Sequence, residues 1–116
     1  MVPELIEALR NEDEDIRAAA AETLAIKGNV AAVPALIRAL QDDEESVRKS
    51  AVSALGTIGD AAIVPRLIEA LNDSDSYVRQ NAVYALEELA TREAKAALKA
   101  YRKNQERANK KTGGIR

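Results

Sequence analysis

A repeat of 31 residues runs through this chain and limits what the chain can fold into. The phrase VPRLIEAL at residues 64–71 returns as VPALIRAL at 33–40 and as VPELIEAL at 2–9. Residues 29–59 and 60–90 are identical at 14 of 31 aligned positions, with no insertion between the two copies. A fixed period of 20 to 50 residues is typical of repeat architectures. We therefore expect stacked copies of one supersecondary unit.

Each copy divides into two amphipathic stretches, here called helix A (shorter) and helix B (longer). The second copy has apolar residues at helical spacing, namely Val33, Leu36, Ile37 and Leu40 in helix A, and Val47, Ala51, Ala54, Leu55 and Ile58 in helix B. A proline near the start of each helix A favours helix initiation. Gly28 and Gly59 can end helix B in the left-handed conformation, and Asp60 can then cap the next helix A. Whether helix A begins at that cap or nearer the proline stays open.

Stacking decides the fold class, because a two-helix unit of this size cannot bury its apolar face alone. The sequence predicts an all-α protein, an α/α superhelix or α-solenoid of stacked helix pairs, with about seven helices. The solenoid is expected to span residues 1–103, with units at about 2–28, 29–59 and 60–90 and a capping helix at 91–103. In this cap, Lys95, Lys99 and Arg102 replace the apolar residues of the earlier copies. Residues 104–116 are expected to form a flexible basic tail.

The copy VPALIRALQDDEESVRKSAVSALGTIGD, residues 33–60, resembles the short HEAT-like repeats of phycobilin lyase subunits. The resemblance covers about residues 2–103. It implies an α-solenoid in which the B helices line the concave side, and it implies a role as chromophore lyase component, scaffold or artificial binder. The first copy departs from the pattern, with Ala25 in place of glycine and Lys27 where later copies carry Ile or Leu.

The amino-acid composition excludes most kinds of catalytic site. The chain has no Cys and no His, so disulfides, thiolate or imidazole metal sites and His-based triads are excluded. The acidic runs NEDED and QDDEE stand at helix starts, where they complement the helix dipole, and they lack the spacing of a calcium loop. We expect no catalytic, cofactor or metal site and no enzyme. Without a signal-peptide pattern or a membrane-length apolar run, the expected location is the cytoplasm, with no membrane contact.

Comparison between copies separates scaffold from candidate function. Positions that agree are needed for stacking, whereas positions that differ can carry specificity. On helix B the differing residues form one stripe beside the core stripe. The predicted partner-binding residues on the concave face are Glu45, Ser46, Lys49, Ser50, Ser53, Ser76, Tyr77, Gln80, Asn81 and Tyr84. Such residues combine flat contact area with adaptable hydrogen bonds. The alternative is a solvated helix face with two half-buried tyrosines.

Arg17, Arg48 and Arg79 recur at the repeat spacing. A ladder of guanidinium groups could hold phosphate. Each arginine, however, lies near an acidic turn, around Asp42 and Asp73, where Asp–Arg pairs can join neighbouring units. We therefore interpret the ladder as structural.

These observations favour a non-enzymatic scaffold that binds a protein or peptide partner. The alternative, implied by the resemblance, is a component or chaperone-like partner of a bilin lyase. Nucleic-acid contact through the basic tail is less favoured, because the tail lacks interleaved aromatics. At the N-terminal end, no polar residues replace the apolar Leu5, Ile6 and Leu9. A homodimer through these three residues is a further prediction.

Overall fold

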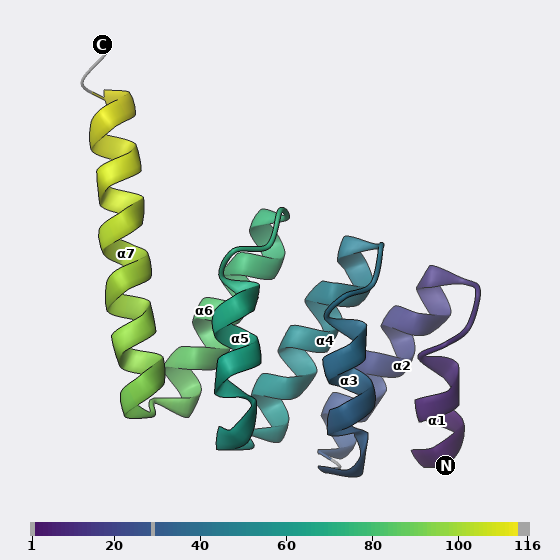
Figure 1. Ribbon diagram of the computed structural model, residues 1–116. Helices are drawn as coiled ribbons and strands as arrows, with labels where there is room; N and C mark the ends of the chain where they lie inside the picture. Colours follow the sequence, from purple (N-terminus) through teal and green to yellow (C-terminus); the bar gives the residue numbers. More distant parts are fainter. Residues whose placement is uncertain (1, 29, 114–116) are drawn as a thin grey trace.

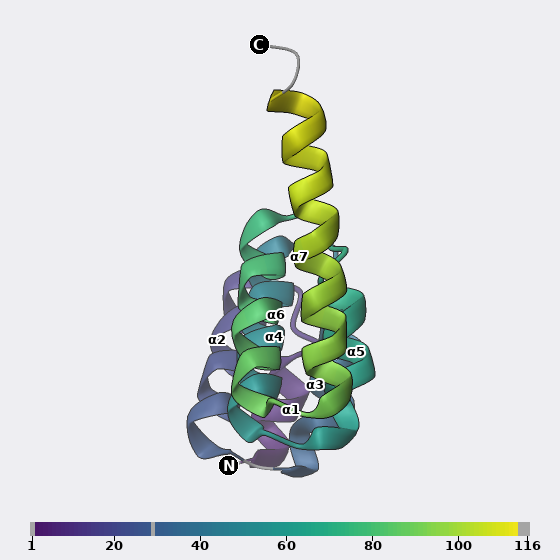
Figure 2. The ribbon, with the colours of Figure 1, turned by 90° about the vertical axis from the view of Figure 1, so that its left-hand side faces the viewer.

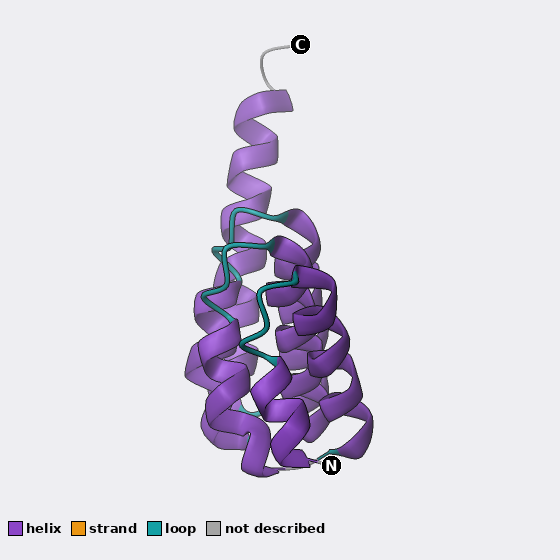
Figure 3. Cartoon of the chain, turned by 90° about the vertical axis from the view of Figure 1, so that its right-hand side faces the viewer, coloured by secondary structure: helices purple, strands orange, loops and turns teal. Residues whose placement is uncertain are grey.

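The computed structural model describes residues 2–28 and 30–113, and these form helices joined by short turns (Figures 1 and 3). The α-helices are α1 (Val2–Ala8), α2 (Glu14–Lys27), α3 (Val33–Ala39), α4 (Glu45–Ile58), α5 (Val64–Ala70), α6 (Ser76–Leu89) and α7 (Arg92–Gly113). Two 3-10 turns, Val30–Ala32 and Ala61–Ile63, precede α3 and α5. The predicted all-α solenoid is confirmed.

The helices are arranged in two layers. The short helices α1, α3 and α5 lie side by side, with the longer α2, α4 and α6 behind them (Figure 1). Figure 2 shows α2, α4 and α6 on one side of the stack and α3 and α5 on the other. Each repeat packs against the one before it, as in other quasi-one-dimensional folds. Helix α7 closes the C-terminal end and continues beyond the other helices (Figure 1).

Proline sets the start of helix A. Helices α3 and α5 begin one residue before Pro34 and Pro65. A helix starting at Ala61 would need an N–H at position 65 to reach the carbonyl of Ala61, and proline has none. Asp60, the expected cap of helix A, therefore lies one turn before the start of α5. Its carboxylate accepts a hydrogen bond from the N–H of Ala62 at 3.0 Å and caps the 3-10 turn instead.

The ends of the B helices follow the predicted left-handed pattern. Gly28 has φ +59° and Gly59 has φ +74°, whereas Asn29 lies outside the described residues. In the third copy the same conformation falls on Ala90, with φ +49°. This conformation costs a residue with a Cβ about 1–2 kcal/mol. The hydroxyl of Thr91 then accepts from the N–H of Ala94 at 3.0 Å and supplies the expected cap of α7.

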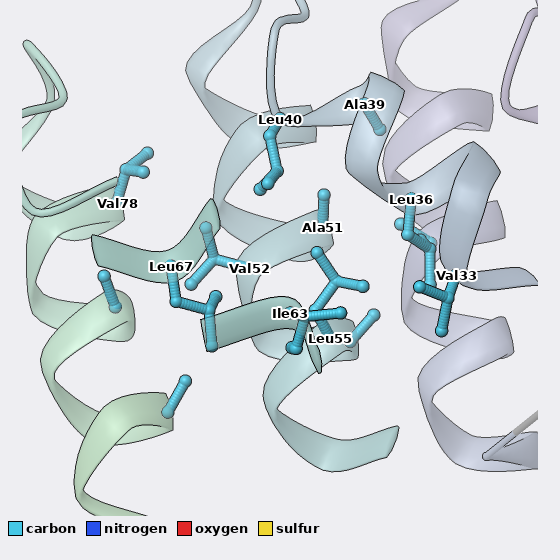
Figure 4. Packing of buried hydrophobic residues seen from close by; sticks show 14 of the residues in the cluster. Val33, Leu36, Ala39, Leu40, Ala51, Val52, Leu55, Ile63, Leu67 and Val78 are labelled. Atoms are coloured by element: carbon cyan, nitrogen blue, oxygen red, sulfur yellow. The ribbon is translucent and has the colours of Figure 1, made fainter. Parts of the chain in front are cut away.

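The core is made of Leu, Ile, Val and Ala side chains that interdigitate between the two layers (Figure 4). Leu24, Leu55 and Leu86 share one repeat position, and each is fully buried. Full burial of a leucine stabilises the fold by roughly 1.5–3 kcal/mol. The agreement of the copies therefore reflects one packing requirement met three times.

Arginine–aspartate pairs connect successive repeats, as predicted. The Arg17 guanidinium donates to both carboxylate oxygens of Asp42 at 2.9 and 3.0 Å, and Arg48 donates to Asp73 at 2.9 and 3.2 Å. Burial alone would raise the pKa of Asp42, but hydrogen bonds from Arg17 and from the Glu44 N–H outweigh it and hold the pKa below its usual value. These bidentate contacts give each repeat a fixed register on the next.

Helix α7 differs from the expectation of a cap ending near residue 103. It runs without a break to Gly113, through most of the segment expected to be a flexible tail. Residues 92–112 contain neither Pro nor Gly and are rich in Ala, Lys, Arg, Gln and Glu, which favour helix. Lys95, Lys99 and Arg102 are exposed, in keeping with a polar end surface.

Candidate functional site

Most of the predicted partner-binding residues lie on the exposed side of α4 and α6. We call this surface, with the matching side of α2, the helix-B face. Seven of the ten predicted residues are exposed, two are half-buried and one is buried. The exposed ones are Glu45, Lys49, Ser53, Ser76, Tyr77, Gln80 and Tyr84; Ser46 and Asn81 are half-buried, and Ser50 is buried.

Ser50 departs from the expectation of a binding residue. Its side chain is only 4% exposed, and its hydroxyl donates to the Glu22 carboxylate at 3.4 Å. Asn81, at the equivalent position of the next copy, donates its amide N–H to the carbonyl of Lys49 at 3.3 Å. Both side chains thus join one B helix to the preceding one. Ser50 belongs to the packing between α2 and α4 and is not available to a partner.

Two tyrosines dominate the helix-B face. Tyr77 and Tyr84 lie two turns apart on α6 and remain 64% and 62% exposed. The Lys49 ammonium lies 5.8 Å from the centre of the Tyr77 ring, close enough for a cation–π contact. The third tyrosine, Tyr101, is instead packed partly against the core. The tyrosines of α6 therefore present most of their ring surface to solvent.

A hollow of about 450 Å³ opens beside Tyr84 on the same face. Its lining comprises Ser53, Gly56, Thr57, Asn81, Tyr84, Ala85 and Glu88. Thr57 and Glu88 were not among the predicted residues. The two residues occupy the same repeat position, 31 residues apart, and are of different types. They therefore meet the criterion for the predicted binding residues, which is variation between copies. Tyr84 supplies an aromatic wall, and the hydroxyl, amide and carboxylate groups supply hydrogen-bond partners.

Carboxylates gather at the edge of the helix-B face where α2 and α4 begin. The Glu44 carboxyl hydrogen-bonds Glu14 and raises the pKa of Glu14. Among the described residues, no group of three or more potential acidic, Cys or His ligands could hold a metal ion. None of the described helices is both long and apolar enough to cross a bilayer.

A second, larger hollow of about 530 Å³ lies at the C-terminal end, between α6 and α7. Its floor is formed by Leu86, Ala90 and Leu98. Its rim is charged, with Lys95, Lys99, Arg102, Lys103, Glu87 and Glu106. Arg102 donates to Glu87 at 2.6 Å across this rim. The charges make this end a poor surface for stacking another repeat.

The N-terminal end differs from the prediction that Leu5, Ile6 and Leu9 are uncovered. Leu9 is 8% exposed, and Leu5 and Ile6 are half-buried against the core of the same chain. These side chains lie against the core of the same chain, because α1 packs on α2. The exposed large apolar residues near this end are instead Ile16, Ile26 and Val30.

Comparison with known proteins gives the same architecture. The family model of HEAT repeats matches residues 1–56 and 34–111. One similar solved structure is that of the complex of CpcE and CpcF of phycocyanin lyase from Nostoc sp. PCC7120, with 36% identity, 84% of this chain and 40% of that chain covered, and a TM-score of 0.79. Another is an engineered protein, with 26% identity, 86% and 50% coverage and a TM-score of 0.65. The search of curated proteins gave no match.

The chain therefore spans half or less of the length of these two solved chains. The family match, in contrast, extends over nearly all of the sequence, from residue 1 to residue 111. The stacked helix pairs, the 31-residue period and the family match agree. The chain belongs to the HEAT-repeat family.

Proposed function

We propose that this protein is a non-catalytic module that binds a protein segment across the helix-B face, centred on Tyr77 and Tyr84. The observation that carries the proposal is the exposure of both rings, 64% and 62%, on one helix. Neither ring is needed to fill the core of the chain. Large rigid aromatic side chains supply much of the binding energy at protein interfaces.

The hollow beside Tyr84 suggests how a partner is recognised. An apolar or aromatic side chain of the partner fits against the Tyr84 ring, while Ser53, Thr57 and Asn81 hydrogen-bond the partner backbone. Glu88 and Glu45 favour a positively charged residue nearby, and Lys49 is already held over Tyr77. A partner segment with one aromatic or aliphatic anchor flanked by Lys or Arg suits this surface.

A direct test compares binding by the natural protein and by the Tyr77→Ala and Tyr84→Ala variants. Proteins captured from the native lysate are identified, and the affinity for the purified partner is then measured by calorimetry. Loss of a central aromatic anchor is expected to cost about 2 kcal/mol or more, roughly thirtyfold in Kd. Melting should barely change. If both variants unfold, the tyrosines are structural and the proposal fails.

A matched control lies in the other layer. Arg66 and Glu69 on α5 form an exposed ion pair at 3.5 Å. Alanine at either position removes a similar amount of exposed surface without touching the helix-B face. Equal loss of binding in these controls would contradict the assignment of the site.

The second candidate function is a component or chaperone-like partner of a bilin lyase. It is supported by the 36% identity to a chain of the phycocyanin lyase complex over 84% of this chain. Incubation with a bilin and an apo-phycobiliprotein tests it, because attachment of the bilin gives a new absorbance band. The band should appear only when this protein is added; its absence with an active partner subunit present would exclude the role.

A further inference from the structure

The third arginine of the ladder differs from the first two in what its guanidinium group binds. In all three, Nη1 donates to a backbone carbonyl six residues earlier, at 2.6 to 2.7 Å, which directs the three side chains alike. Arg17 and Arg48 then use Nε and Nη2 to hold an aspartate of the next repeat. For Arg79, which is half-buried, Nε and Nη2 have no acceptor within residues 2–28 and 30–113.

Helix α7 explains why Arg79 lacks a carboxylate. The aspartates bound by Arg17 and Arg48 lie 25 residues further along the chain, in the turn that follows a helix A of seven residues. The residue 25 positions after Arg79 is Asn104, which lies within the 22-residue α7. Because α7 continues as a helix, it provides no acidic turn at this point. The guanidinium edge of Arg79 is therefore oriented for a carboxylate that its own helix pair does not supply.

A row of lysines lies near this edge. Leu86 follows Arg79 by seven residues, so it is on the same side of α6, about 10 Å further along the helix axis. Leu86 is also part of the floor of the hollow between α6 and α7. Lys95, Lys99 and Lys103 line the α7 side of that hollow, and they form no ion pair in the described part of the chain. Arg79 and the hollow thus form one cationic surface.

The composition of the hollow favours a protein carboxylate over other anions. Four cationic side chains line it against two carboxylates, and one of these, on Glu87, is already bound by Arg102 at 2.6 Å. None of its described lining residues is aromatic, so the hollow offers no ring on which a nucleic-acid base could stack. In the same fold, the two equivalent arginines bind aspartate.

We propose that Arg79 and the lysines of α7 bind an acidic segment of a partner protein. One carboxylate of this segment accepts from both Nε and Nη2 of Arg79, and a second lies beside Lys99. Bidentate arginine–carboxylate contacts combine strength with a fixed geometry. The segment takes the part that Asp42 and Asp73 have between the inner repeats. The site is on a different side of α6 from the two exposed tyrosines, so it adds a second binding surface of opposite charge preference to the proposed function.

Nuclear magnetic resonance of the arginine side chains tests the contact in the intact protein. The Nε–H of Arg79 should exchange with water faster than those of Arg17 and Arg48, which donate to carboxylates. The probe is an amphipathic peptide of Glu and Leu with 14 residues, the length of α4. It should slow the exchange at Arg79 alone, whereas a peptide with Lys in place of Glu should have no effect. An Arg79 signal that does not respond to the acidic peptide at millimolar concentration overturns the proposal.

Calorimetry with the same peptide tests the residues. Arg79→Lys keeps the charge but loses the bidentate geometry, so it should raise Kd at least about tenfold. Lys99→Glu should have a similar effect. Lys110→Glu makes the same charge change further along α7, outside the hollow, and should change Kd by less than about twofold. Lys99 and Lys110 are both exposed, so their variants should melt like the natural protein and keep the test valid if Arg79→Lys is unstable.

Three results would contradict the site. Natural affinity in Arg79→Lys would show that the guanidinium edge is not used. Equal weakening by Lys99→Glu and Lys110→Glu would show attraction to the overall charge of α7 and no defined site. Inorganic polyphosphate that binds as tightly as the acidic peptide, with the same response at Arg79, would exclude the preference for a protein carboxylate.

Discussion

Gly56 and Ala85 lie where α4 and α6 pack so closely that a Cβ on Gly56 would be 2.6 Å from the Cβ of Ala85 and 3.2 Å from its Cα. No real Cβ tolerates such a distance, so the glycine sets the separation of the two helices. This contact also lies in the hollow that holds Ser53 and Tyr84 on one face. The spacing of α4 and α6 thus shapes the candidate binding surface.

Gly56→Ala should therefore destabilise the protein. Within a helix, alanine is usually favoured over glycine by about 1 kcal/mol. Here the overpacking, which typically costs about 1–3 kcal/mol, should outweigh this gain in helix propensity, because the added Cβ would meet backbone as well as side-chain atoms. Urea unfolding followed by circular dichroism measures the difference. Gly59→Ala serves as a comparison: its nearest atom is 3.8 Å away, so it should lose about 1–2 kcal/mol through its φ of +74° alone, without a steric clash. A Gly56→Ala protein as stable as the natural one would show that the helices can separate without cost.

The Arg17–Asp42 pair should make stability depend on pH in the acid range. The pKa of Asp42 lies below its usual value in the folded protein, so its contribution is complete above the unfolded-state pKa of about 3.9 and is lost as pH falls through the lower folded-state pKa. Asp42→Asn should lower the unfolding free energy by about 2 kcal/mol at pH 7. The difference should vanish in strong acid. Asp43→Asn, at an exposed neighbour, should change little; a difference that persists in acid would exclude the ion pair as its cause.

Ala90→Gly should stabilise the protein, in contrast to the usual effect of glycine within a helix. Ala90 has a φ of +49°, where a Cβ is unfavourable. Glycine removes this strain and should raise the free energy of unfolding by about 1 kcal/mol. That corresponds to roughly 4 °C in melting temperature for a domain of this size. Ala100→Gly, in the middle of α7, should shift stability the opposite way or leave it unchanged. A lower melting temperature for Ala90→Gly would mean that the methyl group has a packing role.

Removal of residues 104–116 should leave the solenoid intact. The described side chains from 104 to 110 are all exposed, so little apolar burial is lost. The unfolding free energy should change by less than about 0.5 kcal/mol, the range usual for surface changes. The circular dichroism signal should fall in proportion to the helical residues removed. A large drop in melting temperature would instead show that the distal part of α7 supports the stack.

Much of the fold could be predicted because each repeat must pack on a copy of itself. Leu24, Leu55 and Leu86 recur since one packing environment recurs. The spacing of Arg17 and Asp42 also recurs, so their pairing could be inferred. In contrast, the start of helix A depends on the missing N–H of Pro65. From the sequence, helix A could begin either at the preceding cap residue or nearer the proline.

The site was less predictable, because variation between copies does not by itself mean exposure. Ser50 and Asn81 differ since each forms a polar contact with whichever group the preceding helix offers, a carboxylate in one case and a carbonyl in the other. The hollow beside Tyr84 depends on a helix separation that Gly56 sets and that periodicity does not show. Ile16 occupies the same repeat position as the buried Val47, but what covers a position depends on its neighbours.

The cations of α7 that line the hollow beside α6 also determine how a protein of this design can change in length. A further repeat stacked on Lys95, Lys99 and Arg102 would bury three positive charges, so added units are tolerated before α7 but not beyond it. Each inserted 31-residue unit would keep the Arg–Asp register and move α7 by one constant step from α1. In longer relatives built this way, the distance between the acidic N-terminal end and the basic C-terminal helix would take only discrete values.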